Sequence, residues 1–186
     1  MSNHRVASRY AKSLLELAIE KGQLEEVYAD FKSLEAMGRG SRELSLVLAN
    51  PVLSSDKKLK VLKALFAKGS SQLTSTFFEI VSRKNRENVL MDIAKEFVVQ
   101  YNLHKSIQVA DLTTTVAIDE KQRKQFVELV KEITGKKEVE LVEKINPALI
   151  GGFVLKVNDR QLDESLSSKL KALRMQLTKN HYEKQF

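Results

Sequence analysis

The interval between apolar residues changes once along the chain, near residue 105, and no other feature restricts the fold as strongly. Before this point apolar side chains recur at intervals of three and four residues, the period of an amphipathic helix. After it, the stretch "SIQVADLTTTVAI" alternates in polarity and is rich in β-branched residues, which predicts a β-strand. We therefore predict two domains, an all-helical one over residues 1–105 and a mixed one over residues 106–186.

Six helices joined by short connections are predicted in the first domain, which indicates a compact bundle. Tyr10, Leu14 and Leu17 follow helical spacing in the first of them. Gly22 is placed to end this helix, and Ser41 is a predicted N-cap for the third.

The second domain is predicted to have the order β-α-β-β-β-α. Asp119 and Gln122 form a capping-box pattern before its first helix, and Gly135 is placed to end that helix. Asn158-Asp159 suits a two-residue hairpin turn between the last two strands. A leucine-spaced helix completes the chain, so we assign the whole protein to the α+β class.

Composition excludes several classes of chemistry. The 186 residues contain no cysteine, which removes disulfides, thiolate nucleophiles and cysteine-ligated metals. No apolar run approaches the roughly 20 residues that cross a membrane, and the N-terminus lacks a signal-peptide core, so no direct membrane insertion is expected. The net charge of +7 is spread along the chain. Its densest part, "DKKLKVLKALFAK" (56–68), fits a solvated helix face, or else a contact with an acidic partner or nucleic acid.

No residue pattern points to a metal or cofactor. His4, His104 and His181 lie far apart in the sequence, and no pair has the spacing of metal ligands. Gly151-Gly152 precedes a predicted strand, whereas a phosphate-binding loop leads into a helix. The glycine pair is therefore interpreted as a bulge or a close backbone approach. No catalytic residues and no cofactor are predicted.

Carboxylates near the last helix have a structural interpretation as well. Asp163 and Ser165 precede "LSSKLKALR", where a side-chain oxygen can cap the helix N-terminus. With no catalytic or cofactor site indicated, a surface for binding another protein is the function that the sequence still allows. The first helix has a wide apolar stripe that includes small residues, and the fifth is apolar on more than one side around Phe77 and Ile80. A bundle that buries both helices and a groove for a partner's helix are both consistent with this pattern.

Three stretches resemble a known family. They are "RYAKSLLELAIEKGQLEEV" (9–27), "NPVLSSDKKLKVL" (50–62) and "NPALIGGFVLKVNDRQLDESLSSKLKALR" (146–174). Together they are similar to the delta subunits of bacterial F-type ATP synthase, which are related to the mitochondrial oligomycin-sensitivity-conferring protein. Asp163-Glu164-Ser165 stands where the family commonly has D-G-S, and "KNR" (84–86) replaces a glycine-containing turn.

The resemblance implies a non-catalytic stator subunit at the cytoplasmic face of the bacterial inner membrane. It implies that the helical domain binds the N-terminal helix of an alpha subunit, that the second domain contacts the C-terminal region of the b subunit, and that other head subunits lie nearby. Leu166, Leu170 and Leu173 fit either the b contact or the domain core. The alpha-subunit groove is assigned to Tyr10, Ser13, Leu14, Leu17, Phe77, Ile80 and Val81, and the structural signature to Gly151, Gly152, Asp163 and Ser165. The alternative is a basic helical adaptor for nucleic acid, a function that the low aromatic content of 6% does not favour.

Overall fold

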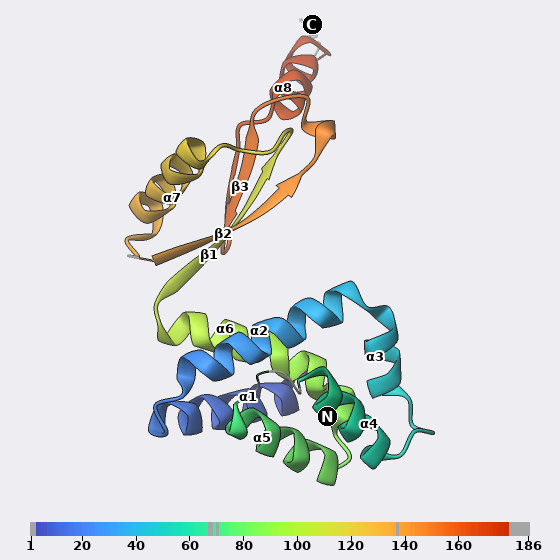
Figure 1. Ribbon diagram of the computed structural model, residues 1–186. Helices are drawn as coiled ribbons and strands as arrows, with labels where there is room; N and C mark the ends of the chain where they lie inside the picture. Colours follow the sequence, from blue (N-terminus) through green and yellow to red (C-terminus); the bar gives the residue numbers. More distant parts are fainter. Residues whose placement is uncertain (1–2, 67–68, 70, 137, 179–186) are drawn as a thin grey trace, which may run out of the picture. The chain divides into compact units, whose positions relative to one another are not determined.

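The computed structural model describes residues 3–66, 69, 71–136 and 138–178. The chain divides into two compact units, Met1–His104 and Lys105–Phe186, one residue before the predicted boundary. The described residues contain eight α-helices and one four-stranded mixed sheet, which confirms the α+β class (Figure 1).

The described residues of the first unit form helices and no strand, and the six α-helices match the predicted number. They are α1 (Asn3–Glu20), α2 (Leu24–Gly40), α3 (Arg42–Ala49), α4 (Ser55–Leu65), α5 (Gln72–Arg83) and α6 (Leu90–His104), with a short 3-10 turn at Glu87–Val89. The predicted helix ends are found as well. Gly22 has a φ of +68° after α1, and the Ser41 hydroxyl accepts a hydrogen bond from the Leu44 N–H at 3.3 Å.

Phe31 of α2 lies at the centre of the helical unit and is fully buried. Its ring centroid lies 5.8 Å from that of Phe77, 6.2 Å from that of Phe78 and 4.9 Å from that of Phe97. These rings come from α2, α5 and α6, so one aromatic cluster joins three helices. Aromatic pairs at such separations add to the stability that burial alone provides.

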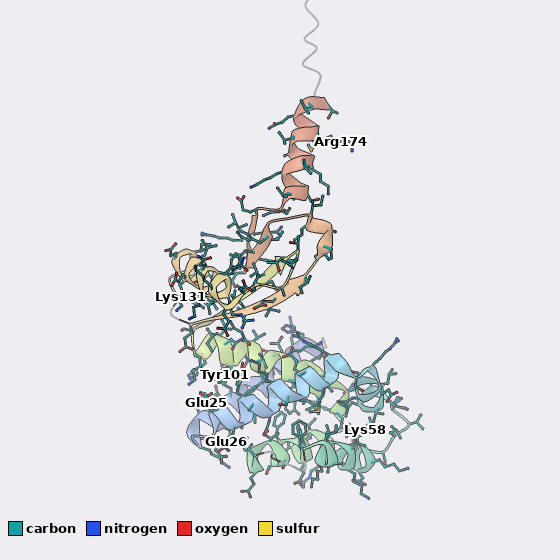
Figure 2. All side chains as sticks on the ribbon, turned by 45° about the horizontal axis from the view of Figure 1, so that its top comes forward. Glu25, Glu26, Lys58, Tyr101, Lys131 and Arg174 are labelled. Atoms are coloured by element: carbon teal, nitrogen blue, oxygen red, sulfur yellow. The ribbon has the colours of Figure 1, made fainter. Side chains whose placement is uncertain are left out.

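Polar contacts fix α2 against its neighbours. The Asp30 carboxylate accepts two hydrogen bonds on the same oxygen, from the Ser71 N–H at 3.0 Å and from the Thr74 hydroxyl at 2.7 Å. α2 is thereby tied to the first turn of α5. The Tyr101 hydroxyl of α6 donates to the Glu25 carboxylate of α2 at 2.7 Å; Figure 2 labels both residues. The Tyr101 ring stacks on that of Tyr28, with centroids 3.8 Å apart.

The second unit has the predicted order of elements. They are β1 (Ile107–Thr114), α7 (Glu120–Thr134), β2 (Glu138–Ile145), a 3-10 turn at Pro147–Leu149, β3 (Phe153–Val157), β4 (Arg160–Asp163) and α8 (Leu166–Thr178). The strand order in the sheet is β2-β1-β3-β4. β1 pairs with β2 in parallel, and the other two pairs are antiparallel.

One face of this sheet forms the core of the second unit. Ala110 and Leu112 of β1, Leu155 of β3 and Val130 of α7 are buried together. α7 covers this face, and it starts at the predicted capping box, where the Asp119 N–H donates to the Gln122 side chain at 3.1 Å (Figure 1). Alternate residues of β1 are buried, as the period of a strand with one covered face requires.

Gly151 and Gly152 bring the backbone before β3 into contact with the residues at the start of α8. Gly152 has a φ of +76°, and a Cβ atom there would collide with the carbonyl oxygen of Glu164. The Leu166 N–H donates to the Gly151 carbonyl at 3.0 Å, and the Glu164 N–H donates to the Phe153 carbonyl at 3.0 Å. Backbone of the two segments is therefore in direct contact, and only glycine fits this position.

Asp163 and Ser165 organise the first turn of α8. The Asp163 carboxylate accepts from the Ser165 N–H at 3.0 Å and from the Ser168 hydroxyl at 2.7 Å. The Ser165 hydroxyl accepts from the Ser168 N–H at 3.2 Å. The hydroxyl groups of Ser165 and Ser168, with the Ser165 N–H, hold the pKa of Asp163 below its usual range.

Candidate functional site

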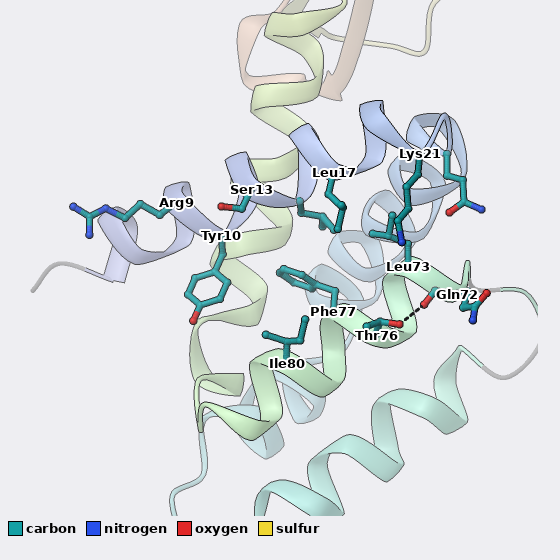
Figure 3. Close-up of a pocket in the computed structure, with 12 residues that line it drawn as sticks. Arg9, Tyr10, Ser13, Leu17, Lys21, Gln72, Leu73, Thr76, Phe77 and Ile80 are labelled. Atoms are coloured by element: carbon teal, nitrogen blue, oxygen red, sulfur yellow. Dashed lines mark hydrogen bonds between the residues drawn. The ribbon is translucent and has the colours of Figure 1, made fainter.

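A groove lies between α1 and α5, with a volume of about 450 Å³ (Figure 3). The two helices run in opposite directions along it. Tyr10 of α1 lies opposite Phe77 of α5, with ring centroids 6.3 Å apart in an edge-on arrangement. Farther along, Leu17 of α1 and Lys21, in the turn just after α1, face the end of the groove that Leu73 of α5 lines.

Six of the seven residues assigned to the groove from the sequence line it. They are Tyr10, Ser13, Leu14, Leu17, Phe77 and Ile80. Val81 differs, because it is only 1% exposed and is not among the residues that line this cavity. It follows Ile80 by one residue, which turns its side chain by about 100° around the helix axis and into the bundle.

The groove has a buried apolar floor and exposed apolar walls. Leu14, Leu73 and Phe77 are buried beneath it. Leu17 remains 40% exposed on one wall and Ile80 remains 47% exposed on the other. Side chains that face each other across a concave apolar surface can bury further area only by contact with another molecule.

The rim of the groove is polar and carries cations. Arg9 lies at its Tyr10 end and Lys21 at the opposite end (Figure 3). On α5 the Thr76 hydroxyl donates to the Gln72 carbonyl at 2.9 Å. At the Tyr10 end the Arg86 side chain donates to the tyrosine hydroxyl at 3.2 Å, with the guanidinium carbon 5.6 Å from the ring centroid. No carboxylate lines this groove among the described residues.

Sequence reasoning missed part of this site, although signals for two residues were present. Leu73 lies four residues before Phe77, and Lys21 lies four residues after Leu17, so both share the face of a predicted groove residue. Arg86 belongs to the turn after α5, and helical periodicity carries no information on where such a side chain points. Its contact with Tyr10 joins residues 76 positions apart.

A second cavity, between the start of α4 and the turn after α5, contains a buried ion pair. The Lys58 ammonium lies 4.0 Å from the Glu87 carboxylate, and the two side chains are 7% and 4% exposed. The Ser82 hydroxyl donates to Glu87 at 3.2 Å. A solvated face was expected for the lysines of this segment. Lys57, Lys60 and Lys63 are exposed as expected, whereas Lys58 is buried. Lys68 lies outside the described residues.

The leucines of α8 are not core residues. Leu166, Leu170 and Leu173 are each about half exposed, and no residue of α8 is buried. The alternative that they form the domain core is therefore wrong. α8 therefore presents an apolar stripe that the described residues of its own unit leave open.

Side chains suited to metal ligation do not gather in the described part of the chain. His4 lies 3.0 Å from Glu96, His104 ends α6, and His181 is outside the described residues. Within the same residues, none of the helices combines the length and the apolar character that crossing a bilayer requires. The groove offers apolar contact and cations, which is the chemistry of binding a helix.

Comparisons with known proteins agree on one family. Residues 6–177 match the profile of the family described as the ATP synthase delta (OSCP) subunit. A protein named ATP synthase subunit delta from Cytophaga hutchinsonii is 39% identical over 178 residues, which cover 96% of this chain and 97% of that protein. Its namesake from Sinorhizobium medicae is 38% identical over 173 residues, which cover 92% of each chain. A chain of the cryo-EM structure of the Toxoplasma gondii mitochondrial ATP synthase hexamer matches with a TM-score of 0.71 and 26% identity, over 92% of this chain and 96% of that chain.

Proposed function

The chain belongs to the ATP synthase delta (OSCP) subunit family, and we propose that its α1–α5 groove holds the N-terminal helix of an alpha subunit. The protein is a non-catalytic subunit of the peripheral stalk and lies at the periphery of the membrane-bound complex. It links the catalytic head to the membrane-anchored part, so that rotation driven by ion flow is coupled to ATP synthesis.

One observation carries the proposal for the groove. Leu17 and Ile80 stay exposed on opposite walls of one concave apolar surface, above the buried floor of Leu14, Leu73 and Phe77. An amphipathic helix laid between them removes apolar area from water, at about 25 cal/mol per Å². A stator subunit must stay bound to the catalytic head without any covalent or catalytic step. Burial of apolar surface can provide binding of that kind.

The second unit is proposed to contact the C-terminal region of the b subunit through α8. The open stripe of Leu166, Leu170 and Leu173 supports this assignment, because a helical partner could cover it. We propose as well that the protein lies at the cytoplasmic face of the inner membrane, where it would join the head to the stalk.

The test of the groove is calorimetric titration of the full-length protein with a synthetic peptide of the alpha-subunit N-terminus. The wild-type chain should bind one peptide with a negative heat-capacity change. Ile80→Asp or Tyr10→Asp should weaken binding by at least tenfold, because each places a carboxylate against an apolar partner face.

Val99→Asp on α6 is the matched control, since Val99 is 53% exposed on a helix outside the groove. It should bind the peptide like the wild type, and circular dichroism should show equal helicity in all variants. Wild-type affinity in Ile80→Asp and Tyr10→Asp would refute the groove as the site. Absence of binding by the wild-type chain would refute the proposed partner.

A further inference from the structure

The two ends of the α1–α5 groove differ in charge. Arg9 and Arg86 lie at the Tyr10 end, and α5 closes there with Arg83 and its C-cap Lys84. All four cations are exposed. The opposite end has Lys21 as its lining cation. Among the described residues, the groove therefore carries more positive charge at the Tyr10 end than at the Lys21 end.

Two of these cations, Arg9 and Arg86, have no carboxylate partner within the described residues, whereas Arg83 interacts with the Glu79 carboxylate. Among the described residues, Arg9 and Arg86 form no ion pair, and the Arg86 side chain is held by the Tyr10 hydroxyl and ring. Glu87, which follows Arg86 in sequence, is buried and directed to Lys58 and Ser82. A concentration of unpaired positive charge beside an apolar groove favours a partner with negative charge at the same place.

The length of the groove limits how a partner helix can lie in it. Lys21, the residue after the end of α1, follows Arg9 by twelve positions, which corresponds to roughly 18 Å at about 1.5 Å per residue. This distance accommodates about three turns of a second helix. A helix of this length placed along the groove has one end over the arginines and the other over Lys21, so its two possible directions are electrostatically different.

We infer that the occupant of the groove is an amphipathic helix with carboxylates at one end, and that this acidic end lies over Arg9 and Arg86. The arginines thus set the direction and register of the bound helix, while the apolar walls supply most of its affinity. This inference rests on the proposed function, because it takes the alpha-subunit helix as the occupant. The observation behind the inferred direction is the positive charge of Arg9 and Arg86 at one end of the groove.

Charge-neutralising variants test the inference in the full-length protein, with the alpha-subunit N-terminal peptide as the probe. Arg9→Gln and Arg86→Gln should each lower affinity about two- to fivefold at low salt, the size expected for exposed ion pairs. The loss should shrink as salt rises, because the screening length falls from about 30 Å at 0.01 M to about 10 Å at 0.1 M.

Two control variants separate charge from structure. Arg86→Lys keeps the charge and should bind nearly like the wild type. Lys12→Gln removes a cation from α1 that pairs with Glu16 and does not line the groove, and it should leave affinity unchanged. Equal affinity in Arg9→Gln, Arg86→Gln and Lys12→Gln would overturn the inference while leaving the groove intact as the site.

The direction of the bound helix follows from double-mutant cycles. Each acidic residue of the peptide is replaced by glutamine and measured against Arg86→Gln and against Lys21→Gln. Coupling of the acidic end to Arg86 is the expected result. Coupling to Lys21 would reverse the direction and overturn the inference. If the wild-type chain does not bind the peptide at all, the proposed function itself fails, which is a distinguishable outcome.

Discussion

Replacement of Asp30 by alanine should destabilise the helical unit through the loss of one shared acceptor. A single oxygen of this carboxylate accepts from the Ser71 N–H and from the Thr74 hydroxyl, at the first turn of α5. Asp30 is 8% exposed and Thr74 is fully buried. In the alanine variant, the Thr74 hydroxyl keeps only its contact with the Ser71 hydroxyl at 2.9 Å, and the Ser71 N–H loses its partner.

The expected loss is about 3 kcal/mol. A hydrogen bond to a charged group contributes about 1.5–3 kcal/mol, and the two bonds at Asp30 share one oxygen and are not independent. With a urea dependence of about 1.5 kcal/mol per molar, the midpoint should fall by about 2 M. Asp30→Asn should cost only about 1 kcal/mol, because its amide oxygen can accept both bonds and only the charge is lost.

Urea unfolding followed by tyrosine fluorescence measures this effect in the helical unit. The chain has no tryptophan, and three of its four tyrosines, Tyr10, Tyr28 and Tyr101, belong to that unit. The fourth, Tyr182, lies outside the described residues. Circular dichroism reports both units, so the transition of the second unit serves as an internal reference and should not move. An unchanged midpoint in Asp30→Ala, or equal losses in Asp30→Ala and Asp30→Asn, would refute the reasoning about the shared oxygen.

Two further predictions concern the second unit. Gly152→Ala should destabilise it by about 2–4 kcal/mol, because the new Cβ meets the Glu164 carbonyl at a positive φ, whereas Gly135→Ala should cost only about 1 kcal/mol, since its φ is also positive but no atom lies within 4 Å of the added Cβ. Urea unfolding followed by circular dichroism compares the two, and equal losses would contradict the backbone contact. The pKa of Asp163 is lowered in the folded protein, so its contribution to stability is present above its unfolded value of about 3.9 and is lost as pH falls through the folded value. Amide exchange at Ser168 should therefore differ between the wild type and Asp163→Asn at neutral pH and converge in acid, and a constant difference at all pH values would contradict this linkage.

Periodicity predicted the helical unit well, because a 3.6-residue repeat reports directly on which face of a helix is buried. It could not decide between Ile80 and Val81, since spacings of three and four from Phe77 both fit one face. The direction in which that face points depends on how α2 and α4 pack against α5. Those contacts come from residues far away in sequence.

Buried charges were beyond sequence reasoning for a related reason. Asp30 lies in a polar part of α2 and looks solvated until Ser71 and Thr74 are brought to it from more than 40 positions away. Lys58 is one of several lysines in its segment, and only the turn after α5 supplies Glu87 as its partner. In the second unit, local signals such as the Asp119–Gln122 box sufficed, because both partners lie within one turn.

The junction between the glycine pair and α8 has a mechanical consequence. α8 has no buried residue, so its own side chains give it little hold on the unit from which it projects. The N-terminal end of α8 is fixed by two backbone hydrogen bonds, from the Leu166 N–H to the Gly151 carbonyl and from the Glu164 N–H to the Phe153 carbonyl. Phe153 begins β3, which is paired on both sides within the sheet. A force applied to α8 would therefore be transmitted to the sheet through backbone hydrogen bonds at the start of β3. Because β3 pairs with both β1 and β4, its ladder hydrogen bonds on both sides would resist that force.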